Sequence, residues 1–254
     1  MTQFQVLVTD RAWPDTSLEQ AVLNPIGATV IEPSTSDEAA LCAAAKEADA
    51  IATTWAQVTP KVIASAPKCR IVARLGIGVD NIAIPAATAR GIPVTNCQDY
   101  CIEEVADHAV GLLLCQARQL GFFHSRTKNG EYSLPAGQQG LRRLSKQTLG
   151  LFGLGRIGRA LCERARALGL RVIAHTASGK DHGLGCPMVS FETLLAESDY
   201  VSIHAPLTDA TRRRFDAAAF AQMKSVAYLI TTSRGGLIDE EALREALQGK
   251  QLAG

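Results

Sequence analysis

The stretch that decides the fold is Thr148–Thr176, TLGLFGLGRIGRALCERARALGLRVIAHT. Apolar residues predict a strand at Thr148–Phe152, and Gly153-x-Gly155-x-x-Gly158 follows it directly. A helix is predicted at Arg156–Leu168 and a second strand at Arg171–Thr176. Three glycines at this spacing are common by chance, but a strand, the glycines, a helix and a second strand within about 30 residues are typical of a dinucleotide-binding turn.

Each glycine of this turn has a separate physical reason. Gly153 allows the tight turn, Gly155 lets a pyrophosphate approach the backbone, and Gly158 lets the helix pack on the strand. The N–H groups of Arg156 and Ile157, at the positive end of the helix dipole, would then hold the phosphates. The stretch therefore predicts NAD or NADP as a cofactor.

The end of the second strand bears on the choice between these two cofactors. An NAD site usually places Asp or Glu there to bind the ribose 2′-hydroxyl, and this sequence has Thr176. In HTASGK, the side chains of His175, Thr176, Ser178 and Lys180 could donate to a 2′-phosphate. We therefore favour NADP, and NAD bound without an acidic partner stays the alternative.

Alternating strands and helices on both sides of this stretch predict an α/β protein with two doubly wound parallel sheets. We expect a flavodoxin-like substrate domain at 1–98 and a Rossmann dinucleotide-binding domain at 99–254, and a length of 254 residues agrees with two domains. The second domain would begin with a long inter-domain helix, Ile102–Leu120, and residues Gly121–Ser145 would form a surface connection. The strands predicted for the first domain are Gln5–Thr9, Ala28–Ile31, Ala50–Thr54, Arg70–Ala73 and Pro93–Thr95.

Composition excludes several classes of protein. A net charge of +1 argues against nucleic acid as a partner, and the basic triplet Arg212–Arg214 is interpreted as surface. Seven cysteines without a Cys-x-x-Cys pair favour a reducing cytoplasm and predict no metal site. The sequence contains no secretory signal and no apolar run of about 18 residues, so we expect no membrane association.

Six segments resemble the D-isomer specific 2-hydroxyacid dehydrogenase family: ARLGIGVDNI, GIPVTN, EEVADHAVGLLL, GLFGLGRIG, SDYVSIHAPLT and LITTSRGGLIDEEAL. They are spread over nearly the whole chain. The resemblance implies hydride transfer between NAD(P)H and C2 of a small 2-keto or 2-hydroxy acid of the D series. It also implies a homodimer formed through the apolar helix Ile102–Leu120 and the segment after it, although burial of that helix between the domains would give the same pattern.

The resemblance also assigns roles to residues. Arg234 would be catalytic, because the family uses this arginine to hold the carboxylate and carbonyl of the substrate. Backbone N–H groups at Ile77 and Gly78 would bind the substrate carboxylate, and Cys101 lies near a substrate-facing position or simply packs. The remaining cofactor contacts would come from Val105, His204, Ala205, Pro206, Thr232 and Ser233; His204 is not expected to be the catalytic acid.

The family's catalytic histidine and its glutamate would lie after the segment that begins QLAG, where this sequence reaches Gly254. We therefore expect a C-terminally truncated chain that lacks proton transfer. Two alternatives stay open: a dinucleotide-binding scaffold of the corepressor type, and an inactive cofactor-binding fragment.

Overall fold

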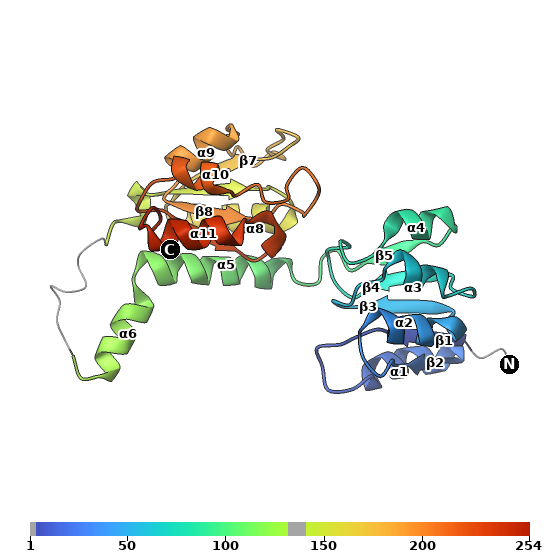
Figure 1. Ribbon diagram of the computed structural model, residues 1–254. Helices are drawn as coiled ribbons and strands as arrows, with labels where there is room; N and C mark the ends of the chain where they lie inside the picture. The colour runs from blue at the N-terminus through green and yellow to red at the C-terminus, as the bar shows by residue number, and fades with distance from the viewer. Residues whose placement is uncertain (1–3, 132–140) are drawn as a thin grey trace. The chain divides into compact units, whose positions relative to one another are not determined.

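The computed structural model describes residues 4–131 and 141–254. The chain divides into two compact units, Met1–Tyr100 and Cys101–Gly254 (Figure 1). Each unit contains a sheet whose strands are all parallel, with helices in the connections between strands. The predicted α/β class with two parallel sheets is confirmed.

The first unit has a five-stranded sheet in the order β2-β1-β3-β4-β5, which is the predicted flavodoxin-like order. Its core forms where alternate strand residues such as Leu7, Ile51 and Val72 meet Leu41 and Val62 from the helices. The elements are β1 (Phe4–Val8), α1 (Ser17–Leu23), β2 (Ala28–Ile31), α2 (Glu38–Ala44), β3 (Ala50–Thr53), α3 (Pro60–Ala64), β4 (Ile71–Arg74), α4 (Ile84–Ala89) and β5 (Val94–Asn96).

The second unit has a four-stranded sheet in the order β7-β6-β8-β9, so the chain turns back across β6 between β7 and β8. Such a reversal is where ligands of open parallel sheets bind. The elements are α5 (Ile102–Ala117), α6 (Leu120–Lys128), β6 (Thr148–Phe152), α8 (Arg156–Ala167), β7 (Arg171–His175), α9 (Phe191–Glu197), β8 (Tyr200–Ile203), α10 (Ala217–Gln222), β9 (Tyr228–Thr231) and α11 (Glu240–Gln248).

Both faces of this second sheet are covered by helices. Leu149 and Leu151 of β6 belong to a buried cluster with residues of α5 and α8, whereas Phe152 belongs to a cluster with residues of α9, α10 and α11. Because successive strand residues point to opposite faces, the two clusters lie on the two sides of the sheet. All five residues of β6 are therefore buried.

The long predicted helix and the connection after it differ from the structure. Helix α5 ends at Ala117 instead of Leu120, and Gln119 adopts a left-handed conformation with φ of 50°. A second helix, α6, then covers part of the predicted irregular connection. This helix buries no residue, so it has no apolar period for sequence analysis to detect; an edge contact between Phe122 and Phe123 supports it locally. Residues 132–140 of that connection lie outside the described residues.

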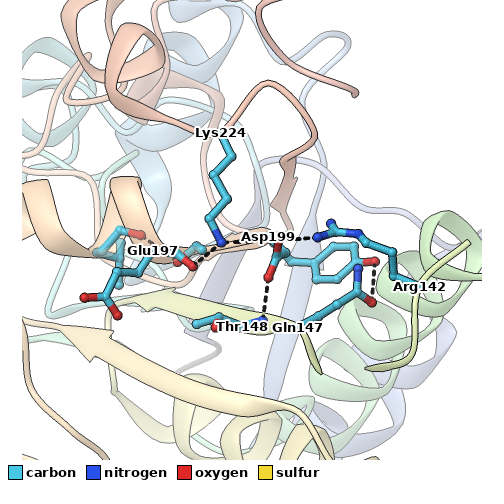
Figure 2. Close-up of polar contacts among 9 residues, drawn as sticks. Arg142, Gln147, Thr148, Glu197, Asp199 and Lys224 are labelled. Carbon is cyan, nitrogen blue, oxygen red and sulfur yellow. Dashed lines mark hydrogen bonds and ion pairs between the residues drawn. The ribbon is translucent and has the colours of Figure 1, made fainter. Parts of the chain in front are cut away.

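One buried carboxylate joins three segments at the amino-terminal edge of the second sheet (Figure 2). Asp199, 3% exposed, accepts hydrogen bonds from the Thr148 N–H at 2.8 Å, Arg142 Nη1 at 3.0 Å and Lys224 Nζ at 3.3 Å. Burial by itself raises the pKa of this carboxyl, but the Thr148 N–H and the two cations hold it below its usual value. Asp199 therefore fixes the start of β6 beside the start of β8.

Asp199→Ala should lower the free energy of unfolding by about 2 to 3 kcal/mol, because it leaves a buried N–H without an acceptor and two cations without their shared carboxylate. Urea denaturation monitored by circular dichroism measures the change. The control is Glu241→Ala, which removes an exposed carboxylate from its pair with Arg244 and should cost less than about 0.5 kcal/mol. Equal losses in the two variants would contradict this role of Asp199.

Candidate dinucleotide site

The carboxyl-terminal ends of the four strands in the second unit meet at one edge of the sheet. Phe152, the last residue of β6, pairs with His175 of β7 and with Ile203 of β8, and Ile203 pairs with Thr231 of β9. The loops that follow therefore begin side by side. They carry the predicted cofactor residues within 153–158, 176–180, 204–206 and 232–233, together with Arg234.

The glycine turn is packed against its neighbours without space for side chains at two of its positions. Gly153 has φ of 105°, and a Cβ placed there would lie 2.6 Å from the Ala205 backbone N. A Cβ at Gly158 would lie 2.3 Å from the Gly153 carbonyl oxygen. Only glycine lets helix α8 approach the end of β6 this closely.

Gly155 has a different environment. A Cβ placed there would meet no atom within 4 Å, so this part of the turn faces open space. Gly155 is also the N-cap of α8 and provides no side-chain acceptor for the first N–H groups of the helix, which include those of Arg156 and Ile157. By contrast, Ser190, Asp216 and Asp239 cap α9, α10 and α11 with their own side chains. The start of α8 thus combines an open approach with backbone donors, which suits a phosphate.

The loop after β7 contains the residues predicted to bind a 2′-phosphate. The Thr176 and Ser178 hydroxyls lie 3.3 Å apart, and the Lys180 N–H donates to Ser178 Oγ. The next carboxylate along the chain, Asp181, accepts hydrogen bonds from the N–H groups of Gly183 and Gly185, both at 3.0 Å. The Asp181 carboxylate is therefore hydrogen-bonded within the turn that it begins.

His175 differs from these neighbours because its ring packs inward. The ring stacks on Phe152 with centroids 5.7 Å apart, and Nδ1 lies 3.0 Å from the Val189 carbonyl oxygen. His175 thus lies at the predicted edge, but its ring packs against Phe152. Sequence analysis could not show these contacts, because they depend on the register between β6 and β7 and on the segment just before α9.

Two groups on the loops after β8 and β9 have unusual environments. Burial lowers the pKa of His204 to about 4, and its Nε2 lies 2.8 Å from Ser202 Oγ, so the ring is neutral near pH 7. Thr232 Oγ1 is buried and has no hydrogen-bond partner in the described part of the protein. Buried hydroxyls are usually hydrogen-bonded, so this oxygen is suited to a bound ligand.

Arg234 and Ser233 complete the loop after β9. Arg234 is half-buried, and its Nη1 donates to the Ser233 carbonyl oxygen at 3.1 Å. The Ser233 hydroxyl lies 3.3 Å from Thr231 Oγ1. Pro206, on the neighbouring loop, accepts a hydrogen bond from the Thr211 hydroxyl through its carbonyl oxygen. Local hydrogen bonds therefore hold both loops.

In the first unit, the predicted substrate loop follows β4. The Ile77 carbonyl accepts from Asn96 Nδ2 at 2.7 Å, the Cys97 N–H donates to the Gly76 carbonyl, and Gly78 follows in the same turn. These contacts tie the loop to the end of β5. Cys101 and Val105, by contrast, lie in the second unit, at the N-cap and in the first turn of α5, and both are half-buried.

Sequence analysis missed Asp10, at the end of β1. Its carboxylate accepts hydrogen bonds from the N–H groups of Thr54 and Trp55, at 2.9 and 2.7 Å. Burial by itself raises the pKa of Asp10, but these bonds and one from the Thr9 hydroxyl keep it below its usual value. The only signal was an acidic residue directly after a predicted strand, a position that often binds local backbone.

The described residues contain no helix long and apolar enough to cross a membrane. Across residues 4–131 and 141–254, no three His, Cys, Asp or Glu side chains gather in a way that could hold a metal ion.

Comparisons with known proteins agree with this geometry. Residues 110–254 match the family model described as "D-isomer specific 2-hydroxyacid dehydrogenase, NAD binding domain". The chain is 38% identical to D-3-phosphoglycerate dehydrogenase of Mycobacterium leprae over 218 residues, which cover 84% of this chain and 40% of that protein. It is also 38% identical to glyoxylate reductase of Thermococcus litoralis over 218 residues, 82% of this chain and 66% of that one.

A solved structure shows the same likeness in three dimensions. The NADPH-dependent glyoxylate/hydroxypyruvate reductase of Sinorhizobium meliloti, in complex with NADP and malonate, has a TM-score of 0.87 and 31% identity, covering 100% of this chain and 78% of that one. The chain spans about two fifths of the length of the phosphoglycerate dehydrogenases that it matches.

The glycine turn gives a prediction about stability. Gly158→Ala should lower the free energy of unfolding by about 2 kcal/mol, because its methyl group would collide with the Gly153 carbonyl. Gly155→Ala should change it by less than about 1 kcal/mol, because its φ of −70° suits alanine and the space is open. Denaturant unfolding of both variants tests the difference, and a reversed order would show that the turn is packed differently.

The buried imidazole of His204 gives a prediction about pH. The unfolded chain takes up a proton near pH 6.5 and the folded chain only near 4, so the stability that this group contributes above pH 6.5 is lost as the pH falls toward 4. The loss should reach about 3 kcal/mol. His204→Asn should remove this part of the pH dependence, measured as the difference between the two stability profiles. If the stability of the wild type and of His204→Asn changes in parallel with pH, the low pKa of His204 is contradicted.

Proposed function

Because the chain belongs to the D-isomer specific 2-hydroxyacid dehydrogenase family, we propose that it transfers a hydride between NAD(P)H and C2 of a small 2-keto or 2-hydroxy acid of the D series. The observation that carries the proposal is that the start of α8, which has no side-chain cap, lies at the same edge of the sheet as the loop that carries the unpartnered Thr232 hydroxyl and Arg234. Such a reaction requires, among other groups, donors for the cofactor phosphates and a guanidinium fork for the substrate carboxylate.

The residues at this edge fit a dinucleotide. Arg156 and Ile157 would donate their N–H groups to the pyrophosphate, and Gly155 would leave room for it. Thr232, with Ser233 and the loop His204-Ala205-Pro206, would contact the ribose and ring at the nicotinamide end, and Val105 would add an apolar contact. When bound, the reduced nicotinamide would supply the hydride.

We propose NADP as the preferred cofactor. Thr176, Ser178 and Lys180 offer two hydroxyls and an ammonium group on an exposed turn, and these can donate to a 2′-phosphate. The nearby carboxylate of Asp181 is held by backbone N–H groups, so it is not committed to a ribose hydroxyl. His175 would contribute less, since its ring packs on Phe152.

For the substrate, Arg234 would hold the carboxylate and polarise the carbonyl oxygen through its planar donors. Backbone N–H groups at Ile77 and Gly78 would bind a carboxylate, and Cys101 would contact the substrate. His204 would not donate the proton, because its pKa of about 4 leaves it unprotonated at neutral pH, so the substrate oxygen would take its proton from water after hydride transfer. The substrates we propose are glyoxylate and hydroxypyruvate, since the chain matches relatives named hydroxypyruvate reductase and glyoxylate reductase.

We also propose that the protein works as a homodimer in the reducing cytoplasm. The outer face of α5 and the segment after it, where Leu120 and Phe122 are exposed, would form the contact between subunits, because the buried residues of α5 already pack within the second unit. All seven cysteines are free thiols, as expected in a reducing compartment.

Fluorescence titration with NADPH and NADH tests the cofactor proposal independently of turnover. We expect a lower Kd for NADPH, and Thr176→Asp should raise the Kd for NADPH at least tenfold, because it places a carboxylate beside the 2′-phosphate. Gly155→Val, which blocks the open approach, should weaken both cofactors. If neither cofactor binds, the proposed function fails; tighter binding of NADH would overturn only the preference for NADP.

A ketoacid assay, following NADPH oxidation with glyoxylate and hydroxypyruvate, tests the chemistry. Arg234→Lys keeps the charge but loses the fork, so kcat/KM should fall about a hundredfold while the Kd for NADPH changes little. An unchanged kcat/KM in this variant would remove Arg234 from the proposed site.

A further inference from the structure

A cavity of about 390 Å³ lies in the second unit, at the sheet edge opposite to the glycine turn. Tyr200 and Tyr228, the first residues of β8 and β9, line it from the sheet, so it opens at the amino-terminal ends of the strands. The five residues of β6 separate the two edges by roughly 17 Å. The cavity is therefore distinct from the dinucleotide site.

The wall of this cavity carries donors of several kinds. Arg142 and Gln147 lie beside Tyr200, whose hydroxyl donates to Gln147 Oε1 at 3.3 Å (Figure 2). The side chains of Gln116, near the end of α5, and Gln119, just before α6, line it as well. A cavity of this size with a few converging polar groups is typical of a site for a small molecule.

The charge near the cavity is positive. Arg142 and Lys224 share the single buried carboxylate of Asp199, so this network has one cation in excess. The neighbouring carboxylate of Glu197 does not cancel it, because Glu197 pairs with Arg171 at 2.6 Å. Arg142 uses Nη1 for Asp199, and a guanidinium has five N–H donors, so it can bind an additional acceptor.

We propose that this cavity binds a small anion that carries a carboxylate or phosphate group, with Arg142 as its cationic anchor. The amide N–H groups of Gln116 and Gln147 supply hydrogen bonds to the rest of the anion, and the Tyr200 hydroxyl orients the Gln147 amide by donating to its oxygen. Because Asp199 holds Arg142 in place at the start of β6 and β8, the guanidinium is positioned before the anion arrives. The second unit thus has an anion site at each edge of its sheet, and this one does not rest on the proposed enzymatic function.

Isothermal titration of the purified protein with inorganic phosphate and with succinate, in the presence of saturating NADP, tests the proposal. Arg142→Gln should weaken binding at least tenfold, because it removes the charge-assisted hydrogen bonds. The matched control is Arg244→Gln, which removes a cation that pairs with Glu241 on α11, outside the residues that line the cavity, and should change the Kd less than twofold. Which of the two probes binds more tightly identifies the anionic group.

A second variant keeps the test valid if Arg142→Gln disturbs the Asp199 network. Gln116→Glu adds a carboxylate to the cavity wall from an exposed helical position and leaves Asp199 untouched, so it should also weaken binding at least tenfold. The proposal is overturned if the wild-type protein binds neither probe, if Gln116→Glu binds as the wild type does, or if Arg244→Gln loses as much affinity as Arg142→Gln.

Discussion

The approach of Gly158 to the carbonyl of Gly153 is the constraint on which the second unit depends. With 2.3 Å between that oxygen and a Cβ at Gly158, no larger residue lets α8 begin directly at the end of β6. This contact directs the start of the helix toward the sheet edge, and the strand register brings the loops after β7, β8 and β9 to the same edge. The candidate site is thus a consequence of backbone packing before any side chain contributes to it.

Asp199 has a related role at the opposite edge. A buried carboxylate is costly unless its oxygens are hydrogen-bonded, and here an N–H and two cations satisfy them. The Asp199 carboxylate orders the starts of β6 and β8, and it also holds Arg142 at the cavity. One residue thus stabilises this edge of the sheet and positions its positive charge. Its partners lie 57, 51 and 25 residues from Asp199 in the sequence.

Much of the fold was predictable because it is encoded locally. An apolar run marked β6 and a period of about 3.6 residues marked α8, and the glycine spacing predicted the turn between them. Helix α6 was not predictable in this way, since it buries no residue and therefore lacks an apolar stripe. The Asp199 network, the low pKa of His204 and the unpartnered Thr232 hydroxyl depend on burial by distant segments, which no local pattern reports. For the candidate site, the sequence could thus predict the residues at the edge but not the environments of their side chains.

Two adjacent residues at the end of β7 differ in how readily they can be substituted. The ring of His175 lies among Phe152 and Phe191, so a different side chain there would disturb the contact between the sheet and α9. Thr176 begins an exposed turn, and its hydroxyl lies 3.3 Å from that of Ser178. Ligand recognition at this edge can therefore diverge through residues 176, 178 and 180 while the hydrophobic core stays the same, so that a change of cofactor requires no compensating change in the fold.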